Sequence, residues 1–398
     1  MNIIFHIDVN NAFLSWSAIY LLKNGYDTDI RKIPSCIAGD EDKRHGIVLA
    51  KSDISKKYKI KTGETLHNAR LKCKDLKVFK PNFFFYREMS DKLYEYFKTI
   101  TPDVERYSID ECFLDLTNTN FLYDDILELA YRIKNEIKEK FSFTVNIGIG
   151  NNKLCAKMAG DFEKPDRVHT LFKEEIETKM WPLPIEDLLY VGKSTSQELR
   201  KMGINTIGQL ANYDLELLKK HFKNQAIFMK EYANGKDDSK VITKYPQKKS
   251  ISLSRTLEYD TNNLEYLKKV ISLMVNRIGM ELRQKKLYAK TIAITLKTND
   301  FEAYSHQKKL VNETNNTMNL LTAALELLDI ILGDKIIRNI GIRVSDLSEY
   351  KNNQISLFEN INKNLDDDKI QTVVDNLNFK YDSLKIMPAV FYKNDDGI

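Results

Sequence analysis

The sequence predicts an α+β protein built from several domains. Two separate stretches alternate strand and helix signals in a split βαβ order, one within the first 170 residues and one after residue 250. Between them, residues 171–240 are helical and polar, with Gly192, Gly203 and Gly208 as interruptions. A length of 398 residues allows about two to four domains, which agrees with this division.

The first stretch contains three strand signals and one long helix signal. Residues 3–7 are a short apolar run that reads as a buried strand, and Asp8 lies at its C-terminal end. Residues 107–116 read as a second strand or hairpin arm, and residues 143–149 alternate in the manner of a third strand. Residues 124–141 place apolar side chains on one helical face. Residues 15–80, which have turn signals and little periodicity, form an insertion that we expect to be a small subdomain.

The second stretch is more basic than the rest of the chain. Its expected elements are strand 250–258, helix 263–286, strands 289–297 and 303–311, helix 316–332 and strand 338–345. Residues 241–345 contain 17 Lys and Arg against 10 Asp and Glu, a net of +7 that exceeds the +5 of the whole chain. This excess predicts a surface that faces phosphate groups. Residues 348–398, rich in Asn and Asp, are expected to be a largely flexible tail.

Composition narrows the class of protein only slightly. A pI of about 8.6 permits a nucleic-acid partner without requiring one. The four cysteines form no C-x-x-C pair, so a zinc site is not expected, and scattered thiols fit a reducing cytoplasm. The N-terminus has no basic region typical of a signal peptide, and no apolar run reaches the roughly 18 residues of a membrane span.

Three acidic residues carry the functional hypothesis. Asp8 ends the first strand, and the pair Asp110 and Glu111 lies in the second. If these strands are neighbours, three carboxylates come together and repel one another unless cations neutralise them. Hard oxygen ligands suit Mg²⁺, and two such ions about 3.5–4 Å apart can activate a 3′-hydroxyl and stabilise a leaving pyrophosphate. The competing interpretation is three unrelated surface acids.

Four motifs, in order along residues 1–347, resemble those of the Y-family DNA polymerases. Residues 108–115 (SIDECFLD) resemble the S-I-D-E-x-x-L-D motif, and residues 7–13 (IDVNNAF) resemble the opening motif of the family. Residues 146–159 (NIGIGNNKLCAKMA), continuing into Asp161 and Lys164-Pro165, resemble a third motif. Residues 338–345 (RNIGIRVS) resemble the last strand of the DNA-binding domain. The ordered set makes the resemblance specific.

The resemblance implies a right-hand polymerase with named parts. These are a ferredoxin-like palm (1–14 and 80–170), small fingers (15–79), a thumb with a helix-hairpin-helix (171–240), a linker (241–249), a little finger (250–347) and a tail (348–398). It also assigns two magnesium ions to Asp8, Asp110, Glu111 and the Val9 carbonyl. Phe13 matches the steric gate that rejects ribonucleotides, and Lys164 matches a residue that contacts the incoming triphosphate.

Two positions depart from the commonest family pattern. In the fingers, residues 50–58 (AKSDISKKY) lack the usual Tyr and Arg and are closer to the loop of the polymerase V catalytic subunit. Lys51 and Lys56 could still meet phosphate as point charges, and Asp53 is expected to point away. In the thumb, Tyr190 takes the place of the first hairpin glycine, ahead of Gly192 and Lys193, which match the element that contacts a DNA phosphate.

Further contacts are implied for DNA and for a protein partner. The DNA-facing candidates in the little finger are Ser250, Ser252, Arg255, Lys290, Lys297, Arg338 and Arg343. Residues 354–358 (QISLF) resemble the peptide with which bacterial polymerases dock on the sliding clamp, Gln354 as hydrogen-bonding group and Leu357 and Phe358 as apolar anchors. Tethering of this kind raises the local DNA concentration.

The resemblance therefore implies a monomeric, cytoplasmic, template-directed DNA polymerase for translesion synthesis, error-prone and without proofreading. Its substrates are primer-template DNA and dNTPs. Three alternatives stay open: a catalytically weak regulator that binds DNA or the clamp, a nuclease that uses the same metals, and a helix-hairpin-helix glycosylase, which the strand-rich halves oppose.

Overall fold

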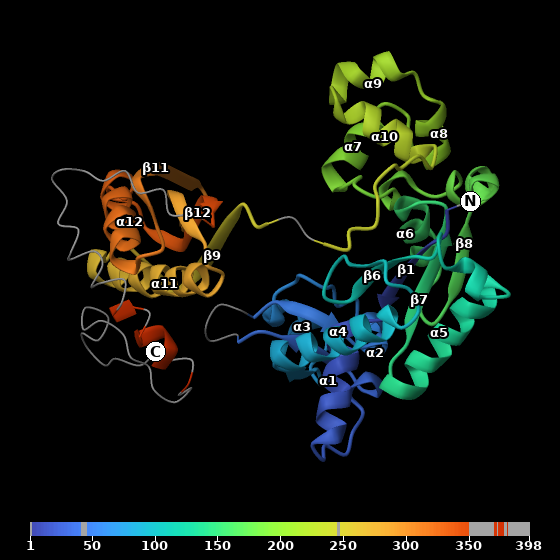
Figure 1. Cartoon of the computed structure of the whole chain (residues 1–398), viewed down its shortest axis with the longest axis horizontal. Helices are drawn as coiled ribbons and strands as arrows, with labels where there is room; N and C mark the ends of the chain where they lie inside the picture. The colour runs from blue at the N-terminus through green and yellow to red at the C-terminus, as the bar shows by residue number, and fades with distance from the viewer. Residues whose placement is uncertain are drawn as a thin grey trace. The chain divides into compact units, whose positions relative to one another are not determined.

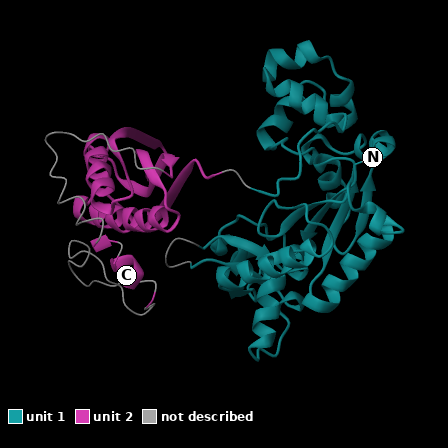
Figure 2. Cartoon of the chain, in the orientation of Figure 1, with its two compact units in different colours: residues 1–245 teal, residues 246–398 magenta. Residues whose placement is uncertain are grey.

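The chain forms two compact units in the computed structural model, residues 1–245 and residues 246–398 (Figures 1 and 2). The structure describes residues 2–40, 46–244, 247–349, 370–371, 373–377 and 380. Each unit has its own apolar core. The units are therefore described separately below.

A five-stranded sheet organises unit 1. Its strands are β5 (Val104–Arg106), β6 (Glu111–Asp115), β1 (Ile4–Val9), β7 (Val145–Gly150) and β8 (Val168–Leu171), in that spatial order. The central β1 is antiparallel to both neighbours, whereas β7 and β8 are parallel. Both faces of β1 are buried, which agrees with its continuous apolar run. The crossover between β6 and β7 is α5, the helix expected at residues 124–141, so the split βαβ prediction is confirmed.

Four helices pack on this sheet. They are α1 (Ala12–Lys23), α4 (Phe83–Lys98), α5 (Ile126–Phe141) and α6 (Lys153–Asp161). Helix α6 crosses β7 so closely that a Cβ on Gly148 would lie 2.0 Å from the carbonyl oxygen of Ala156. A Cβ on Gly150 would lie 2.7 Å from the backbone nitrogen of the same residue. Only glycine allows this approach, which brings Lys153 and Lys157 of α6 to Glu105 on β5 and Glu111 on β6.

The insertion after α1 folds as a small sheet with its own core. Its strands β2 (Ser35–Ala38), β3 (Val48–Lys51) and β4 (Lys77–Phe79) lie in the order β3-β2-β4. The helical elements of this region are η1 (Ile30–Lys32), α2 (Asp53–Lys57) and α3 (Leu66–Lys72). A separate cluster of buried residues, including Val48, Leu66 and Ala69, holds it together.

A helical lobe closes unit 1. Its main helices are α7 (Lys193–Lys201), α8 (Ile207–Asn212), α9 (Leu215–Phe222) and α10 (Gln225–Ala233), which stand apart from the sheet in Figure 1. Short helical turns elsewhere in the unit are η2 (Asn120–Leu122), η3 (Lys173–Glu175), η4 (Ile176–Met180) and η5 (Ile185–Asp187). Residues Val241 and Ile242, at the end of this lobe, return to the sheet, where Ile242 N donates to Glu105 Oε2 at 2.7 Å.

Unit 2 is a four-stranded sheet covered by two helices. Its elements are β9 (Ser250–Thr261), α11 (Leu264–Gln284), β10 (Tyr288–Thr298), β11 (Ala303–Thr314), α12 (Thr317–Ile331) and β12 (Ile337–Ser348). All neighbouring strands are antiparallel, in the order β11-β10-β12-β9. Both helices cover one face and pack on one large apolar cluster. Each expected element of the second stretch is present, so the β-α-β-β-α-β prediction is confirmed.

The C-terminal region differs from expectation where it is described. Residues 370–371 and 373–377 are helical; Gln371 and Asp375 both accept hydrogen bonds from Arg283 of α11, and Gln371 also accepts from Thr317 N at the start of α12. The described residues of the expected tail are therefore helical, and residues 350–369 lie outside the described residues. Polar contacts hold this segment, because Ile370 and Val373 are exposed whereas Asp375 and Gln371 bind Arg283. None of the described helices combines the length and apolar character needed to cross a bilayer.

Candidate active site

The strand register places the three predicted acids next to one another along the backbone. Asp8 in β1 pairs directly with Glu111 in β6. Asp110 precedes β6, and its carbonyl accepts a hydrogen bond from Val9 N at 3.1 Å. Because directly paired residues in an antiparallel sheet share a face, Asp8 and Glu111 direct their side chains to the same side. The neighbourhood expected from the sequence is thus present in the backbone.

Asp8 is a buried carboxylate that requires a compensating cation. Only 9% of the residue is exposed. Burial is the largest influence on its pKa and raises it to about 6; the Lys164 ammonium opposes this rise, and the charges of Glu111 and Asp110 add to it. Lys164 Nζ bonds directly to Asp8 Oδ2, and it also pairs with Asp161 at 2.8 Å. The nearest positive charge to Asp8 is therefore the lysine expected to contact triphosphate.

Glu111 has a similar cationic partner that the sequence reasoning did not single out. Lys157 Nζ on α6 lies 2.6 Å from Glu111 Oε1, with only 12% of the lysine side chain exposed. His6 Nε2 lies 3.9 Å from the same oxygen. Burial, followed by the charge of Lys157, lowers the pKa of His6 well below its ordinary value, so its ring is neutral. Lys157 is in the quoted third motif, and its four-residue spacing from Lys153 on one helix face was the available signal.

Asp110 is held by a local turn. Ser108 Oγ donates to Asp110 Oδ1 at 2.6 Å and accepts from the backbone nitrogens of Asp110 and Glu111 at 3.2 and 3.1 Å. This turn immediately precedes β6 and orients the Asp110 side chain separately from its neighbours. Asp8, Asp110 and Glu111 therefore each have a different partner.

The side chains of the site are of the type that binds a hard divalent ion. Three carboxylates on adjacent backbone positions supply oxygen ligands, and two of them already have an ammonium group in contact. Within the described ranges, however, no three His, Cys, Asp or Glu side chains are gathered in a geometry that could hold a metal. The lysines keep the charges compensated while the carboxylates stay apart.

A buried asparagine pair fixes the loop that carries Lys164. Asn146 on β7 is fully buried and accepts from Asn10 Nδ2 at 3.0 Å. Its Nδ2 donates to the carbonyls of Gly160 and Glu163 at 3.0 and 2.6 Å, and its Oδ1 accepts from Arg167 N at 3.3 Å. The loop 160–167 is therefore tied to β7 and β1 from several directions. Sequence reasoning quoted Asn146 within a motif but assigned it no role.

The steric-gate candidate lies at the edge of an aromatic cluster. Phe13 stacks on Tyr86 with ring centroids 4.9 Å apart, and it contacts Phe83 edge-on at 5.9 Å. Phe13 is half-buried, so part of its ring faces away from the core. The cluster supports the ring rigidly, as a residue that excludes a substrate group requires.

The fingers candidates lie near the start of α1. Asn11 Nδ2 donates to the Lys51 carbonyl at 2.7 Å, which joins β3 to the residues just after Asp8. Lys51 Nζ donates to Thr62 Oγ1 at 3.1 Å, and partial burial, then the charge of Lys56, lowers the Lys51 pKa. Lys56 pairs with Asp53 at 2.6 Å in an exposed ion pair. The acid therefore offsets part of the positive charge of this loop.

The thumb hairpin has an exposed tyrosine at its turn. Gly192 forms the N-cap of α7, followed by the exposed Lys193. Tyr190 has a φ of +67° and is 65% exposed, its ring packs on Tyr232, and its hydroxyl lies 3.4 Å from that of Tyr107. The left-handed backbone that glycine usually provides is thus kept by a bulky residue.

The open face of the unit 2 sheet holds some of the DNA candidates but not others. Ser250 and Ser252 on β9 pair with Ser345 and Arg343 on β12, on the face that the helices leave uncovered. Arg255 pairs with the buried Ile340 and so lies on the helix-covered face.

The other basic candidates of unit 2 have partners near the sheet ends. Lys290 lies 3.6 Å from Glu313, and Arg338 lies 3.4 Å from Asp260. Lys297 and Arg338 both approach the ring of Phe301, at 4.8 and 5.0 Å. Gln354, Leu357 and Phe358, the clamp-binding candidates, lie outside the described residues.

Comparison with known proteins identifies the family. The model of the impB/mucB/samB family matches residues 7–161, that of its C-terminal domain matches residues 248–357, and that of the IMS family HHH motif matches residues 173–204. The chain therefore belongs to the impB/mucB/samB family, the Y-family DNA polymerases.

Relatives and a solved structure agree with this assignment. A protein named DNA polymerase IV from Clostridium acetobutylicum is 42% identical over 394 residues, 99% of each chain. A second DNA polymerase IV, from Acetivibrio thermocellus, is 36% identical over 89% of each chain. A solved Y-family DNA polymerase chimera has a TM-score of 0.75 at 21% identity and covers 86% of this chain and 98% of its own. The right-hand, multidomain α+β fold expected from the sequence is confirmed.

Proposed function

We propose that this chain is a template-directed DNA polymerase of translesion synthesis, which adds dNTPs to a primer 3′-end by two-metal phosphoryl transfer. The observation that carries the proposal is the pairing of Asp8 with Glu111 on adjacent strands, with Asp110 hydrogen-bonded beside them through its carbonyl. Error-prone synthesis without proofreading belongs to the same proposal. A cytoplasmic location and a monomeric state belong to the same proposal.

The acids would hold two Mg²⁺ ions together with the Val9 carbonyl. When bound, the ions activate the attacking hydroxyl and stabilise the leaving pyrophosphate. The chain's own contribution is to keep Asp8 buried and Glu111 in register, with Lys164 and Lys157 compensating their charge until cations arrive. Lys164, released from Asp8, can then reach an incoming triphosphate, because its side chain is 37% exposed.

The remaining parts position the substrates. Phe13 excludes a 2′-hydroxyl, and Lys51 and Lys56 supply positive charge for phosphate. Gly192 and Lys193 contact the DNA backbone without reading bases. Gln354, Leu357 and Phe358 dock on the sliding clamp and so compensate for weak DNA binding. Departures at Asp53 and Tyr190 concern nucleotide and DNA affinity rather than chemistry.

Primer extension with Mg²⁺ tests the catalytic centre. We expect Asp110→Asn to lower the rate by at least about 1,000-fold, because one metal ligand is lost. Asp124→Asn, which removes one exposed acid from the same unit, serves as the matched control and should extend the primer normally. Equal activity of Asp110→Asn and wild type would reject the assigned centre, and activity in neither would favour the regulator.

Sugar selection tests the gate separately. Replacing Phe13 by Val opens space next to the sugar while an apolar side chain remains at this half-buried position. Incorporation of ribonucleotides relative to deoxynucleotides should rise by about 100-fold or more, from loss of the steric clash. Phe83 contacts Phe13 edge-on in the same cluster and serves as the control. Its replacement should leave the ratio of ribonucleotide to deoxynucleotide incorporation near that of wild type. An unchanged ratio in the Phe13 variant would remove this residue from the gate.

A further inference from the structure

We propose that the hydroxyl groups of Tyr107 and Tyr190 together form a binding site for a backbone phosphate of the primer strand. These two side chains, one before β6 and one in the thumb hairpin, are called the tyrosine pair. The inference rests on the proposed function, because it takes primer-template DNA as the substrate. It gives a role to Tyr190, which occupies the position of the first hairpin glycine.

The thumb hairpin keeps its shape although residue 190 is not a glycine. Tyr190 has a φ of +67°, in the left-handed region that a residue with a Cβ rarely adopts. Its ring packs on that of Tyr232, with centroids 5.8 Å apart, and this contact helps to hold the unusual backbone. Val191 N still donates to the Leu188 carbonyl at 2.9 Å, which closes the turn. The Tyr190 side chain is therefore an addition to the hairpin and does not disrupt it.

Tyr107 belongs to the turn that carries two of the three acids. Its backbone N donates to the Glu111 carbonyl at 3.0 Å. Its ring contacts Phe113 edge-on, with centroids 5.3 Å apart, and Lys157 Nζ lies 5.2 Å from the ring centroid. The ring is thus held both by its own backbone and by its neighbours. Its hydroxyl is consequently fixed in position near the catalytic strands.

The tyrosine pair has hydrogen-bonding capacity to spare. The two hydroxyl oxygens are 3.4 Å apart, whereas strong O–H···O bonds measure about 2.7–2.8 Å. Their mutual bond is therefore weak, and it uses only one of the two hydroxyl hydrogens. Tyr190 is 65% exposed and Tyr107 is 38% exposed, so a ligand can reach both. Hydrogen bonding to Tyr190, followed by burial, raises the pKa of Tyr107, which keeps its hydroxyl a neutral donor.

The charges around the tyrosine pair are already balanced. Lys157 Nζ lies 2.6 Å from Glu111, and Lys153 Nζ lies 2.7 Å from Glu105. The site therefore attracts a phosphate through neutral hydroxyl donors, which are among the side-chain groups that contact phosphate oxygens in protein–DNA complexes. Neutral donors displace no counterions. The tyrosine pair should consequently strengthen DNA binding without adding to its salt dependence.

The position of the pair matches the expected course of the primer strand. Tyr107 lies three residues before Asp110, and the primer 3′-end must reach the acids in the proposed function. Tyr190 lies two residues before Gly192, in the hairpin proposed to contact the DNA backbone. The hydroxyls meet between these two elements. A strand that touches both the acids and the hairpin therefore passes the tyrosine pair.

Fluorescence anisotropy with a labelled primer-template at several salt concentrations tests the site. The variants Tyr190→Phe and Tyr107→Phe keep the rings and remove one hydroxyl each. Each should raise the Kd by about tenfold, because a hydrogen bond to a charged group is lost. The slope of log K against log salt should stay at the wild-type value. Tyr190→Gly should bind like Tyr190→Phe, since both lack the same hydroxyl.

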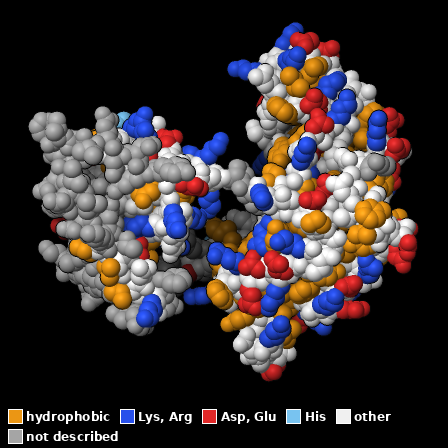
Figure 3. Space-filling view, viewed as in Figure 1, with side chains coloured by type: hydrophobic (Ala, Val, Ile, Leu, Met, Phe, Trp, Pro, Cys, Tyr) orange, Lys and Arg blue, Asp and Glu red, His pale blue; other side chains and the backbone are white. Residues whose placement is uncertain are grey.

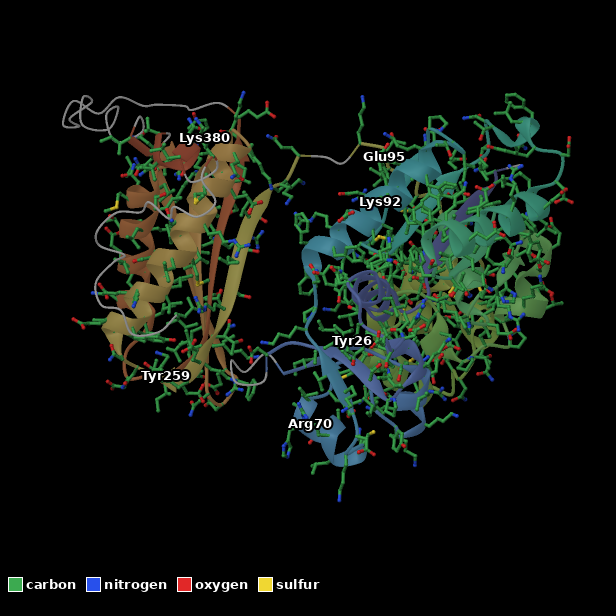
Figure 4. All side chains as sticks on the ribbon, turned by 90° about the horizontal axis from the view of Figure 1, so that it is seen from below. Tyr26, Arg70, Lys92, Glu95, Tyr259 and Lys380 are labelled. Atoms are coloured by element: carbon green, nitrogen blue, oxygen red, sulfur yellow. The ribbon has the colours of Figure 1, made fainter. Side chains whose placement is uncertain are left out.

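The matched control is Tyr26→Phe. Tyr26, labelled in Figure 4, is 41% exposed, and its ring packs edge-on against Phe79 at 5.8 Å. It follows the C-terminal end of α1, a helix about 18 Å long whose other end lies next to the acids. Removal of its hydroxyl should leave both the Kd and the salt slope unchanged.

Three results would overturn the phosphate site. Wild-type Kd values in both Phe variants would mean that the hydroxyls only join the thumb to the palm, an effect confined to the free energy of unfolding. A changed salt slope would show that a charged group makes the contact. Weaker binding in Tyr190→Gly alone would assign the contact to the ring.

The same measurements separate this inference from the proposed function, because binding is measured without Mg²⁺ or nucleotide. Weaker binding by the Phe variants supports the tyrosine pair even if wild type extends no primer. Normal primer extension together with unchanged Kd values in the Phe variants rejects the tyrosine pair alone. If wild type does not bind primer-template at all, both the tyrosine pair and the proposed substrate are rejected.

Discussion

At the scale of single residues, the site is organised around charge compensation. Asp8 and Glu111 each contact one lysine, Lys164 and Lys157, drawn from a loop and a helix that follow β7. Burial of a carboxylate without a nearby cation destabilises the folded state. The two lysines therefore stabilise the paired strands before metal binds. On the visible face of unit 1, Figure 3 shows blue and red side chains next to one another, in keeping with this local pairing.

The raised pKa of Asp8 gives the first prediction. A folded-state pKa of about 6, above the ordinary 3.8, means that the folded protein favours the protonated acid. The stability from this group is complete below about pH 4 and is lost as the pH rises through 6. A divalent ion binds the ionised form, so its stabilising effect should appear over the same window. The increase in Tm on adding Mg²⁺ should be larger at pH 7.5 than at pH 5.

The matched variant for this measurement is Asp8→Asn, which keeps the shape of the side chain and removes its titration. In this variant the Mg²⁺-dependent increase in Tm should be small at both pH values. A wild-type increase that is equal at both pH values would mean that Asp8 does not bind the metal. An unaltered increase in Asp8→Asn would lead to the same conclusion.

At the scale of elements, the apolar patterns predicted most of the strands and helices, and local side-chain chemistry decided the rest. The expected strand 107–116 is shorter, because Ser108 Oγ accepts from two backbone N–H groups and forms a turn. The adjacency of Asp8 and Glu111 followed from the split βαβ order. Their partner Lys157 did not follow, because a contact between residues 46 apart depends on how α6 crosses β7. Composition predicted a flexible tail and could not reveal that Arg283 binds part of it.

The loop 160–167 gives the second prediction. Asn146 satisfies donors and acceptors on Asn10, Gly160, Glu163 and Arg167 in a fully buried place. Asn146→Ala leaves several of these groups unpaired, so the free energy of unfolding should fall by about 2–4 kcal/mol in urea titrations. The KM for dNTP should rise more than kcat falls, because the loop positions Lys164. The control Asn151→Ala removes hydrogen bonds that are exposed to solvent, so it should lower the free energy of unfolding by less than about 1 kcal/mol.

A merely structural role of Asn146 would lower stability and leave the KM of the folded fraction unchanged. The conservative variant Asn146→Gln provides a further comparison, since it keeps the amide but moves it by one methylene. A normal KM in Asn146→Ala would remove the positioning role. If Asn146→Ala had the same free energy of unfolding as wild type, other interactions would have to replace the buried hydrogen bonds.

At the scale of the whole molecule, each unit contributes a different part of the proposed function. Unit 1 contains the acids, the fingers candidates and the hairpin, and unit 2 contains the basic surface. The division falls at residues 245 and 246, within the region expected to be a linker. Figure 3 shows more blue than red on the described part of unit 2, in agreement with the local charge excess.

The open face of the unit 2 sheet gives the last prediction. Arg343 pairs with Ser252 on this face, whereas Arg255 pairs with the buried Ile340 on the face that the helices cover. Each phosphate contact contributes about 0.9 to the slope of log K against log salt for duplex DNA. Arg343→Gln should therefore reduce this slope by about 0.9, and Arg255→Gln, the matched control, should leave it unchanged. Fluorescence anisotropy with labelled duplex at several salt concentrations measures both slopes. A reduced slope in the Arg255 variant alone would show that DNA binds the helix-covered side or the sheet edge instead, because only charges in contact with phosphate displace counterions.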